Sequence, residues 1–173
     1  ASNTASSSST AAASGVSSTQ ASESSAAVTG SLGAVGFSIS TLNNPFFVSM
    51  ANGAKSAAKE QGINLTIVDA GNNAAKQSTD IEDLVSKNIK VLVVNPVDSS
   101  SVVPTVKDAI AAGIKVIAVD RYVEGKIQDC FIGTDNIKAG ETAGKYFLDK
   151  VGNGAKIAIL EGIPGASSAI ERN

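Results

Sequence analysis

The stretches KVLVVN at residues 90–95 and KVIAVD at 115–120 decide the fold of this chain. Each is a short, mostly β-branched run that ends in a polar residue, and such runs are typical of strands buried on both faces of a parallel sheet. Similar runs occur at 33–40, 64–70 and 156–162, with a shorter one at 129–135. Longer helical patterns separate the runs, so the sequence predicts repeated βαβ units. The expected fold is α/β, a Rossmann-like three-layer αβα arrangement around a parallel sheet.

The segments between the predicted strands carry apolar residues at the spacing of one helix face. The first three stripes are Phe47, Met50, Ala51, Ala54 and Ala58, then Ile81, Leu84 and Val85, then Val102, Val103, Val106, Ala109 and Ile110. Gly62 and Gly113 follow the first and third helices, where glycine commonly ends a helix. A fourth helix at 137–151 is expected to bury Ala139, Ala143, Tyr146, Phe147 and Val151.

Residues 1–30 differ in composition from the rest of the chain. Ser, Ala and Thr fill 23 of the first 29 positions, and Glu23 is the one charged residue there. Such a segment cannot bury enough apolar surface to offset roughly 1–2 kcal/mol of backbone entropy per residue. It is predicted to be a disordered tether. No signal peptide pattern is present, so either the protein has none or it was removed before Ala1.

Composition excludes several classes of protein. The net charge is -2 with no basic stripe, so nucleic acid is not an expected partner. No stretch of about 18 apolar residues occurs, so no membrane-spanning helix is expected. The chain has no His and a single cysteine, Cys130, which excludes an internal disulfide and a multi-cysteine metal site. We interpret Cys130 as a small buried residue in a strand.

Signatures of enzymes and cofactors are missing. Without His, acid–base chemistry would depend on carboxylates or lysines, and no pair of these follows the predicted strands. There is no phosphate-binding P-loop, and the glycine-containing stretch 30–36 begins before the first predicted strand instead of following it. The segment 161–172 follows a strand and begins a helix, so an anion at that helix start stays open as a minor alternative. We expect no catalysis, no metal and no cofactor.

Polar residues follow three of the predicted strands, and the carboxyl ends of parallel strands are where ligands bind. They are Asn44 in TLNNPFF (41–47), Asn95 before Pro96, and the pair Asp120 and Arg121. Amide, carboxylate and guanidinium groups together match a ring of hydroxyls that both donate and accept hydrogen bonds. The neighbouring Phe46 and Phe47 offer a flat apolar surface to the C–H face of a sugar. The pattern therefore indicates a polyol site.

Each of these residues also has a plainer interpretation. Asn44 caps a helix that Pro45 opens, and Asn95 only makes a turn. Asp120 and Arg121 form a surface ion pair, which contributes about 0–1 kcal/mol. Phe47 lies on the core stripe of its helix, whereas Phe46 lies off it. No single position decides between the two interpretations, but three strand ends with the same chemistry favour the ligand site.

The same residues resemble the ribose-binding proteins, the receptors of bacterial sugar importers of the ATP-binding cassette (ABC) type. The matching stretches are STLNNPFFVSM (40–50), NPVDSSSV (95–102), VIAVDR (116–121), GTDNIKAGETAG (133–144) and ILEGIPGASSAIER (159–172). The resemblance implies the type I periplasmic-binding-protein fold, in which two lobes close over one sugar. It implies that residues 31–133 form the first lobe. The chain would cross to the second lobe near Thr134 to Asn136, so residues 134–173 contain this crossing and the start of the second lobe.

The resemblance also implies the site residues and partners. Asn44, Phe46, Phe47, Asn95, Asp120 and Arg121 match sugar-contacting positions of the first lobe, and Arg172 matches an arginine of the second. The implied ligand is a monosaccharide, ribose first, and the implied partner is the membrane permease of an ABC importer. Because the chain stops soon after a helix start, we expect a truncated second lobe, and weak binding by this part alone.

Localisation and two competing functions complete the expectations. The first 30 residues resemble the spacer of Gram-positive binding lipoproteins. This resemblance implies an extracytoplasmic protein that is held at the cell surface through a lipid anchor and has no other contact with the membrane. The alternative location is the periplasm. A sugar receptor for chemotaxis or quorum signalling would use the same module with another membrane partner. The effector domain of a LacI-type regulator has the same architecture, but it needs an amino-terminal helix-turn-helix, and residues 1–29 show no such pattern.

Overall fold

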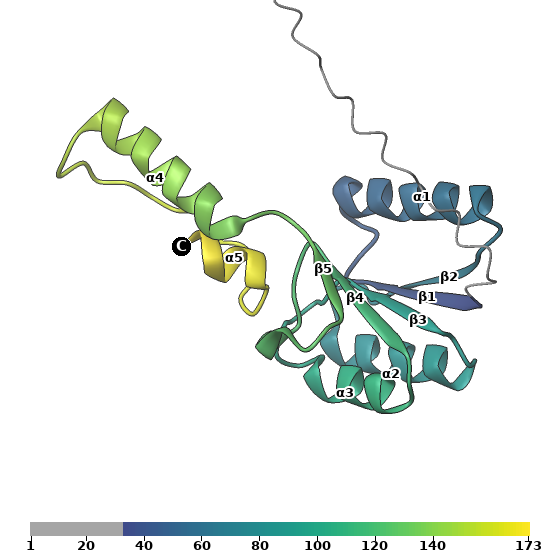
Figure 1. Cartoon of the computed structure of the whole chain (residues 1–173). Helices are drawn as coiled ribbons and strands as arrows, with labels where there is room; N and C mark the ends of the chain where they lie inside the picture. Colours follow the sequence, from purple (N-terminus) through teal and green to yellow (C-terminus); the bar gives the residue numbers. More distant parts are fainter. Residues whose placement is uncertain (1–32) are drawn as a thin grey trace, which may run out of the picture. The chain divides into compact units, whose positions relative to one another are not determined.

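The computed structural model describes residues 33–173, so the predicted tether at 1–30 lies outside the described residues. One parallel sheet has the strand order β2-β1-β3-β4-β5 (Figure 1). Its strands are β1 (Ala34–Ile39), β2 (Asn64–Asp69), β3 (Val91–Val94), β4 (Lys115–Val119) and β5 (Cys130–Ile132). All five runs lie inside stretches that the sequence predicts as strands. The α/β class and the parallel sheet are confirmed.

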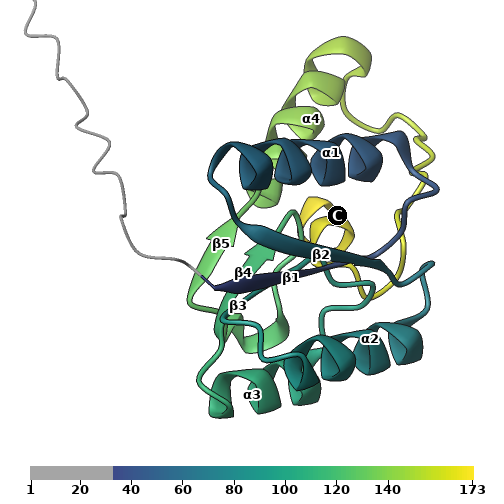
Figure 2. The same cartoon turned by 90° about the vertical axis from the view of Figure 1, so that its right-hand side faces the viewer.

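Helices cover both faces of the sheet, which gives the three expected layers. Helix α1 (Pro45–Glu60) lies on one face, and α2 (Ala74–Ser86) and α3 (Val103–Ala111) lie on the other (Figures 1 and 2). The chain steps outward from β1 to β2 and then returns past β1 to β3. Because crossovers between parallel strands are right-handed, this change of direction moves the connecting helix to the opposite face.

Two apolar clusters hold the layers together, one on each face of the sheet. Phe37 and Ile39 of β1 pack against Phe47 and Ala51 of α1. The other cluster joins α2 and α3 to the sheet through Ile81, Leu84, Leu92, Val94, Val102, Val106, Ala109, Val116 and Ala118. Full burial of one large aliphatic side chain contributes about 1.5–3 kcal/mol, so these stripes explain why the helices dock here. The predicted stripe of α3 is wrong only at Ile110, which is exposed.

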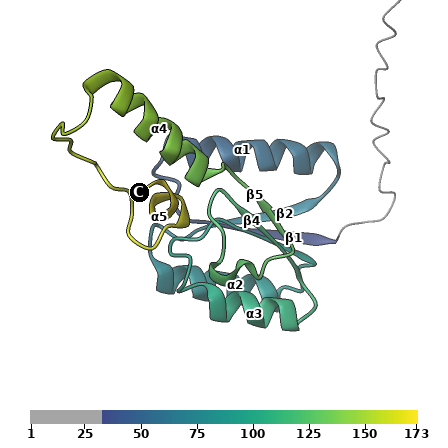
Figure 3. The same ribbon diagram turned by 60° about the vertical axis from the view of Figure 1, so that its left-hand side comes forward.

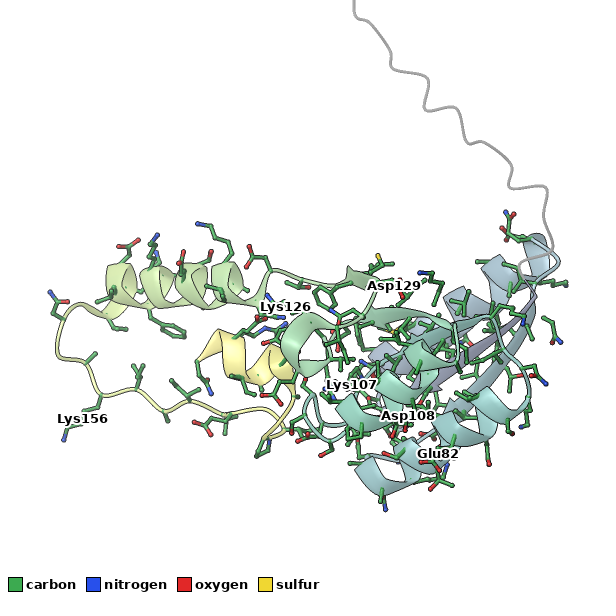
Figure 4. All side chains as sticks on the ribbon, turned by 60° about the horizontal axis from the view of Figure 1, so that its bottom comes forward. Glu82, Lys107, Asp108, Lys126, Asp129 and Lys156 are labelled. Carbon is green, nitrogen blue, oxygen red and sulfur yellow. The ribbon has the colours of Figure 1, made fainter. Side chains whose placement is uncertain are left out.

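The helix ends follow local chemistry, which the sequence predicts for Asn44, Gly62 and Gly113 but not for Asn73. The side chains of Asn44 and Asn73 accept hydrogen bonds from backbone N–H groups at the starts of α1 and α2. Such caps contribute about 1 kcal/mol each. Gly62 and Gly113 have positive φ angles of 66° and 78° just beyond α1 and α3. Polar residues cover the outer helix surfaces, where Glu82, Lys107 and Asp108 point away from the sheet (Figure 4).

The last part of the described chain departs from the prediction. Residues 156–162 form no strand, because no described strand lies beside them to accept and donate backbone hydrogen bonds. Helix α4 (Asn136–Val151) buries only Asn136, and the residues predicted for its buried side are partly or fully exposed. No described layer covers that face. The short helix α5 (Ser167–Arg172) lies beside α4, and an extended segment connects the two (Figure 3).

Cys130 is also placed differently from the prediction. It is exposed, because β5 is the last strand of the described sheet and this edge carries no further layer. The short helix η1 (Glu124–Lys126) precedes β5. Asp129 fixes the strand beside β4 by accepting hydrogen bonds from Lys115 Nζ at 2.8 Å and from the backbone N–H of Val116 at 2.9 Å.

Candidate functional site

The candidate site lies at the carboxyl ends of β1, β3 and β4. In the strand order 2-1-3-4-5 the direction of progression reverses between β1 and β3, and ligands of such sheets bind at this point. The residues that follow these strands are Ser40, Asn95 and Asp120. The sheet therefore brings together the three strand ends that the sequence singles out.

The loop after β1 leads into helix α1 with two phenylalanines of opposite exposure. Asn44 Oδ1 accepts a hydrogen bond from Phe46 N at 2.9 Å, so the capping interpretation of Asn44 is confirmed. Phe46 is 57% exposed, whereas Phe47 is 4% exposed and belongs to the core on the α1 face. The two rings meet edge to face with centroids 5.3 Å apart. Of these two rings, that of Phe46 is the one that presents an open aromatic surface.

Arg121 is buried at the end of β4. Its Nη1 donates to the carbonyl of Pro96 at 2.9 Å, and its guanidinium carbon lies 5.3 Å from the ring centroid of Phe47. Asp120 Oδ2 is 3.7 Å from Arg121 Nε, and both side chains are largely buried, so this is not the surface pair considered from the sequence. Burial lowers the pKa of Arg121, and the charge of Asp120 opposes that change. Among the described residues, Arg121 Nε has no hydrogen-bond partner, although it is ion-paired with Asp120.

The segment before α5 is docked onto the loops of the sheet. Ser99 N donates to Gly165 O at 2.9 Å, and Ser167 N donates to Ser99 Oγ at 3.2 Å. Ser167 Oγ in turn accepts from Tyr122 N at 3.0 Å. These bonds fix α5, and with it Arg172, near the strand ends. Because Ser167 N bonds to Ser99, the start of α5 does not offer this N–H to the anion considered above.

A cleft of about 440 Å³ lies between the strand ends and the last segment of the chain. Asn44, Arg121 and Arg172 line it, so three of the seven predicted site residues converge. Phe46, Phe47, Asn95 and Asp120 are not among the lining residues. Asn95 is fully buried. The lining also includes Glu161 and Ser168, which the sequence analysis did not identify because their segment was expected to be a strand and a helix start.

Three further observations bear on the chemistry of the site. Within residues 33–173, no cluster of three or more His, Cys, Asp or Glu is arranged to hold a metal ion. The described helices are all too short or too polar to cross a membrane. The cleft instead combines guanidinium, amide, carboxylate and hydroxyl groups from Arg121, Asn44, Glu161 and Ser168, a set that suits a ligand with several hydroxyls.

Comparison with known proteins gives a consistent result. Residues 35–173 match the periplasmic binding protein domain family. The ribose import binding protein of Bacillus subtilis is 46% identical over 138 residues, which are 80% of this chain and 45% of that protein. The chain thus spans about half the length of the curated relatives it matches.

Solved structures agree with the sequence relatives. An ABC transporter solute binding protein from Mycobacterium smegmatis with bound glycerol superposes with a TM-score of 0.75 at 42% identity, over 83% of this chain and 49% of that one. A Caulobacter myo-inositol binding protein bound to myo-inositol gives a TM-score of 0.76 at 32% identity, with the same coverage. The fold is therefore that of the type I periplasmic binding proteins.

Proposed function

This chain belongs to the periplasmic binding protein domain family, and from that premise we propose that it captures ribose or a similar monosaccharide and delivers it to an ABC importer. The observation that carries the proposal is the convergence of Arg121 and Arg172 on one cleft from the two sides of the link at 134–136. In this reading residues 31–133 form the first lobe and 134–173 begin the second. The protein is a carrier, and the proposed site performs no catalysis.

The chemistry of the cleft supports a sugar as the ligand. Arg121 Nε is a buried donor without a hydrogen-bond partner among the described residues, and such a donor costs about 1–3 kcal/mol unless a ligand or water satisfies it. A sugar hydroxyl in the cleft can accept from the Arg121 guanidinium while it donates to a carboxylate such as that of Glu161. Asp120, Phe46, Phe47 and Asn95 belong to the proposal as residues next to this cleft, with Phe46 as the exposed apolar surface.

The proposed partners and location follow from the same family. We place the protein outside the cytoplasm, with a membrane permease as the partner that receives the sugar. Residues 1–30 serve as a tether, and a lipid anchor on the cell surface of a Gram-positive bacterium would account for their composition. Fractionation of the source cells would find the protein in the cytoplasm if this assignment is wrong.

Titration calorimetry and thermal unfolding with ribose, xylose and galactose test the proposal. Ribose at 100 times its Kd should raise the free energy of unfolding by about 2.7 kcal/mol. Arg172→Ala should weaken binding roughly tenfold or more, the loss typical of a charged hydrogen bond. Lys107→Ala, which removes a cation from the outer surface of α3, is the matched control and should leave Kd unchanged (Figure 4). Absence of heat and of thermal shift with every sugar would refute the proposal.

A further inference from the structure

Two polar side chains are completely enclosed beneath the strand ends. Asn95, at the end of β3, is 0% exposed, and Gln77, from α2, is 1% exposed. Burial of a polar group without hydrogen bonds is costly, so the partners of these two amides indicate why they are here. Gln77 was not singled out from the sequence, where it looks like an ordinary polar position on a helix.

The side-chain amide of Asn95 joins all three strand ends of the site. Its Oδ1 accepts from Ser40 N at 3.2 Å and from Ser40 Oγ at 2.6 Å. Its Nδ2 donates to Val119 O at 3.1 Å and to Asp120 Oδ2 at 3.4 Å. An amide has two acceptor lone pairs and two donor hydrogens, so this set uses its whole capacity. Nothing remains for a ligand in the described conformation.

Gln77 holds the backbone on the other side of Asn95. Its Nε2 donates to Asn95 O at 2.9 Å and to Ser38 Oγ at 3.2 Å, and its Oε1 accepts from Val97 N at 2.8 Å. It therefore fixes the turn from β3 through Pro96. The carbonyl of Pro96 is the acceptor for Arg121 Nη1, so Gln77 is also linked to the arginine of the site.

The residue that these bonds restrain most directly has an unfavourable backbone conformation. Asp120 has a φ of 62°, and the N–H of Arg121 bonds back to Val119 O at 2.7 Å to close a tight turn around it. Left-handed conformations of residues other than glycine persist where the surrounding structure enforces them, and they cluster at functional sites. The Asn95 side chain donates to two groups of this turn, the carbonyl of Val119 and the carboxylate of Asp120.

From these contacts we propose that Asn95 and Gln77 are positioning residues, which orient Asp120 and Arg121 toward the sugar without touching it. This inference rests on the proposed function and changes one part of it, since the sequence analysis assigned Asn95 to direct contact. The two amides act through the turn at 119–121 and through the carbonyl of Pro96. The Asn95–Ser40 bonds also join the residues that follow β1 and β3. A ligand would therefore lie outside these bonds, beyond the ends of the strands.

A double-mutant cycle on ribose binding tests the inference in the full protein. Gln77→Leu should weaken binding roughly tenfold, the equivalent of one buried hydrogen bond. Asp120→Asn weakens binding by itself, and in its presence the further effect of Gln77→Leu should largely disappear, because Gln77 acts on Asp120 through Asn95. Asn95→Asp, which replaces the amide donor by an acceptor facing Asp120, should behave in the same way.

The control separates positioning from loss of stability. Thr105→Val alters another buried polar residue of the α2 and α3 face, and it should lower the unfolding midpoint without changing Kd. An unchanged Kd in Gln77→Leu, or additive effects with Asp120→Asn, would overturn the positioning role.

A readout without ligand keeps this inference distinct from the proposed function. The Arg121 Nη1 protons, which bond to the carbonyl of Pro96, should be protected from exchange in NMR spectra of the parent and lose that protection in Gln77→Leu. If no sugar binds to the parent, the proposed function fails, whereas an unchanged Arg121 resonance in the variant would refute the positioning role by itself.

Discussion

At the scale of single residues, Asp98 shows how a loop at the sheet edge is stabilised by ionisation. Its Oδ1 accepts from Ser100 N at 3.0 Å, Ser100 Oγ at 2.7 Å and Ser101 N at 2.7 Å. Partial burial acts to raise the pKa of Asp98, but the hydrogen bonds from Ser101 and Ser100 outweigh it, so the pKa lies below 3.8. The loop also carries Ser99, which holds the segment before α5.

The sign of this shift gives a pH-dependent prediction. Because the folded state has the lower pKa, the carboxylate stabilises the protein above about pH 3.8, and this contribution is lost as the pH falls through the folded-state pKa. Asp98→Asn should therefore be less stable than the parent at pH 7, by under about 1 kcal/mol since solvent screens the group. The difference should vanish in strong acid. Chemical unfolding from pH 7 to pH 2 measures it, and a constant difference would contradict the assignment.

At the scale of elements, a glycine sets the distance between α4 and α5. A Cβ added to Gly140 would come within 2.6 Å of the backbone carbonyl oxygen of Arg172, so Gly140→Ala must push α5 away. Gly144 on the same helix has nothing within 4 Å, and Gly144→Ala is the matched control. We expect Gly140→Ala to weaken sugar binding severalfold by displacing Arg172. Gly144→Ala should leave Kd unchanged and stabilise α4 by roughly 0.5–1 kcal/mol. Equal Kd values in the two variants would exclude this role of Gly140.

The elements also show where prediction from sequence works. The strands at 91–94 and 115–119 and the cap Asn44 have local sequence patterns that predict them. The segment 156–162 has the same local pattern, yet a strand forms only where a second strand accepts its hydrogen bonds. Helix α4 is amphipathic in the same way, and its apolar stripe is exposed because no described layer covers it.

At the scale of the whole molecule, stability should be distributed unevenly. β1 and β3 are paired on both sides and packed between two layers, whereas α4 carries Tyr146, Phe147 and Leu148 at 52–60% exposure. Opening of a segment costs least where few apolar contacts hold it. Hydrogen exchange should therefore be slowest at amides of β1 and β3 and at least about tenfold faster along α4. Equal protection in both regions would show that another layer covers α4 in solution.

The sequence by itself determined the α/β class and the order of most elements, and it predicted a polyol site. Hydrophobic period, caps and polar strand ends are local features, and each can be recognised within a short window. Only the tertiary structure decided which polar residues line the cleft and which support it. Asn95 looks like a ligand contact in the sequence, but its bonds reach Ser40, 55 positions away, and Asp120, 25 positions away. Whether an amide remains free for a sugar depends on which strands the sheet places side by side.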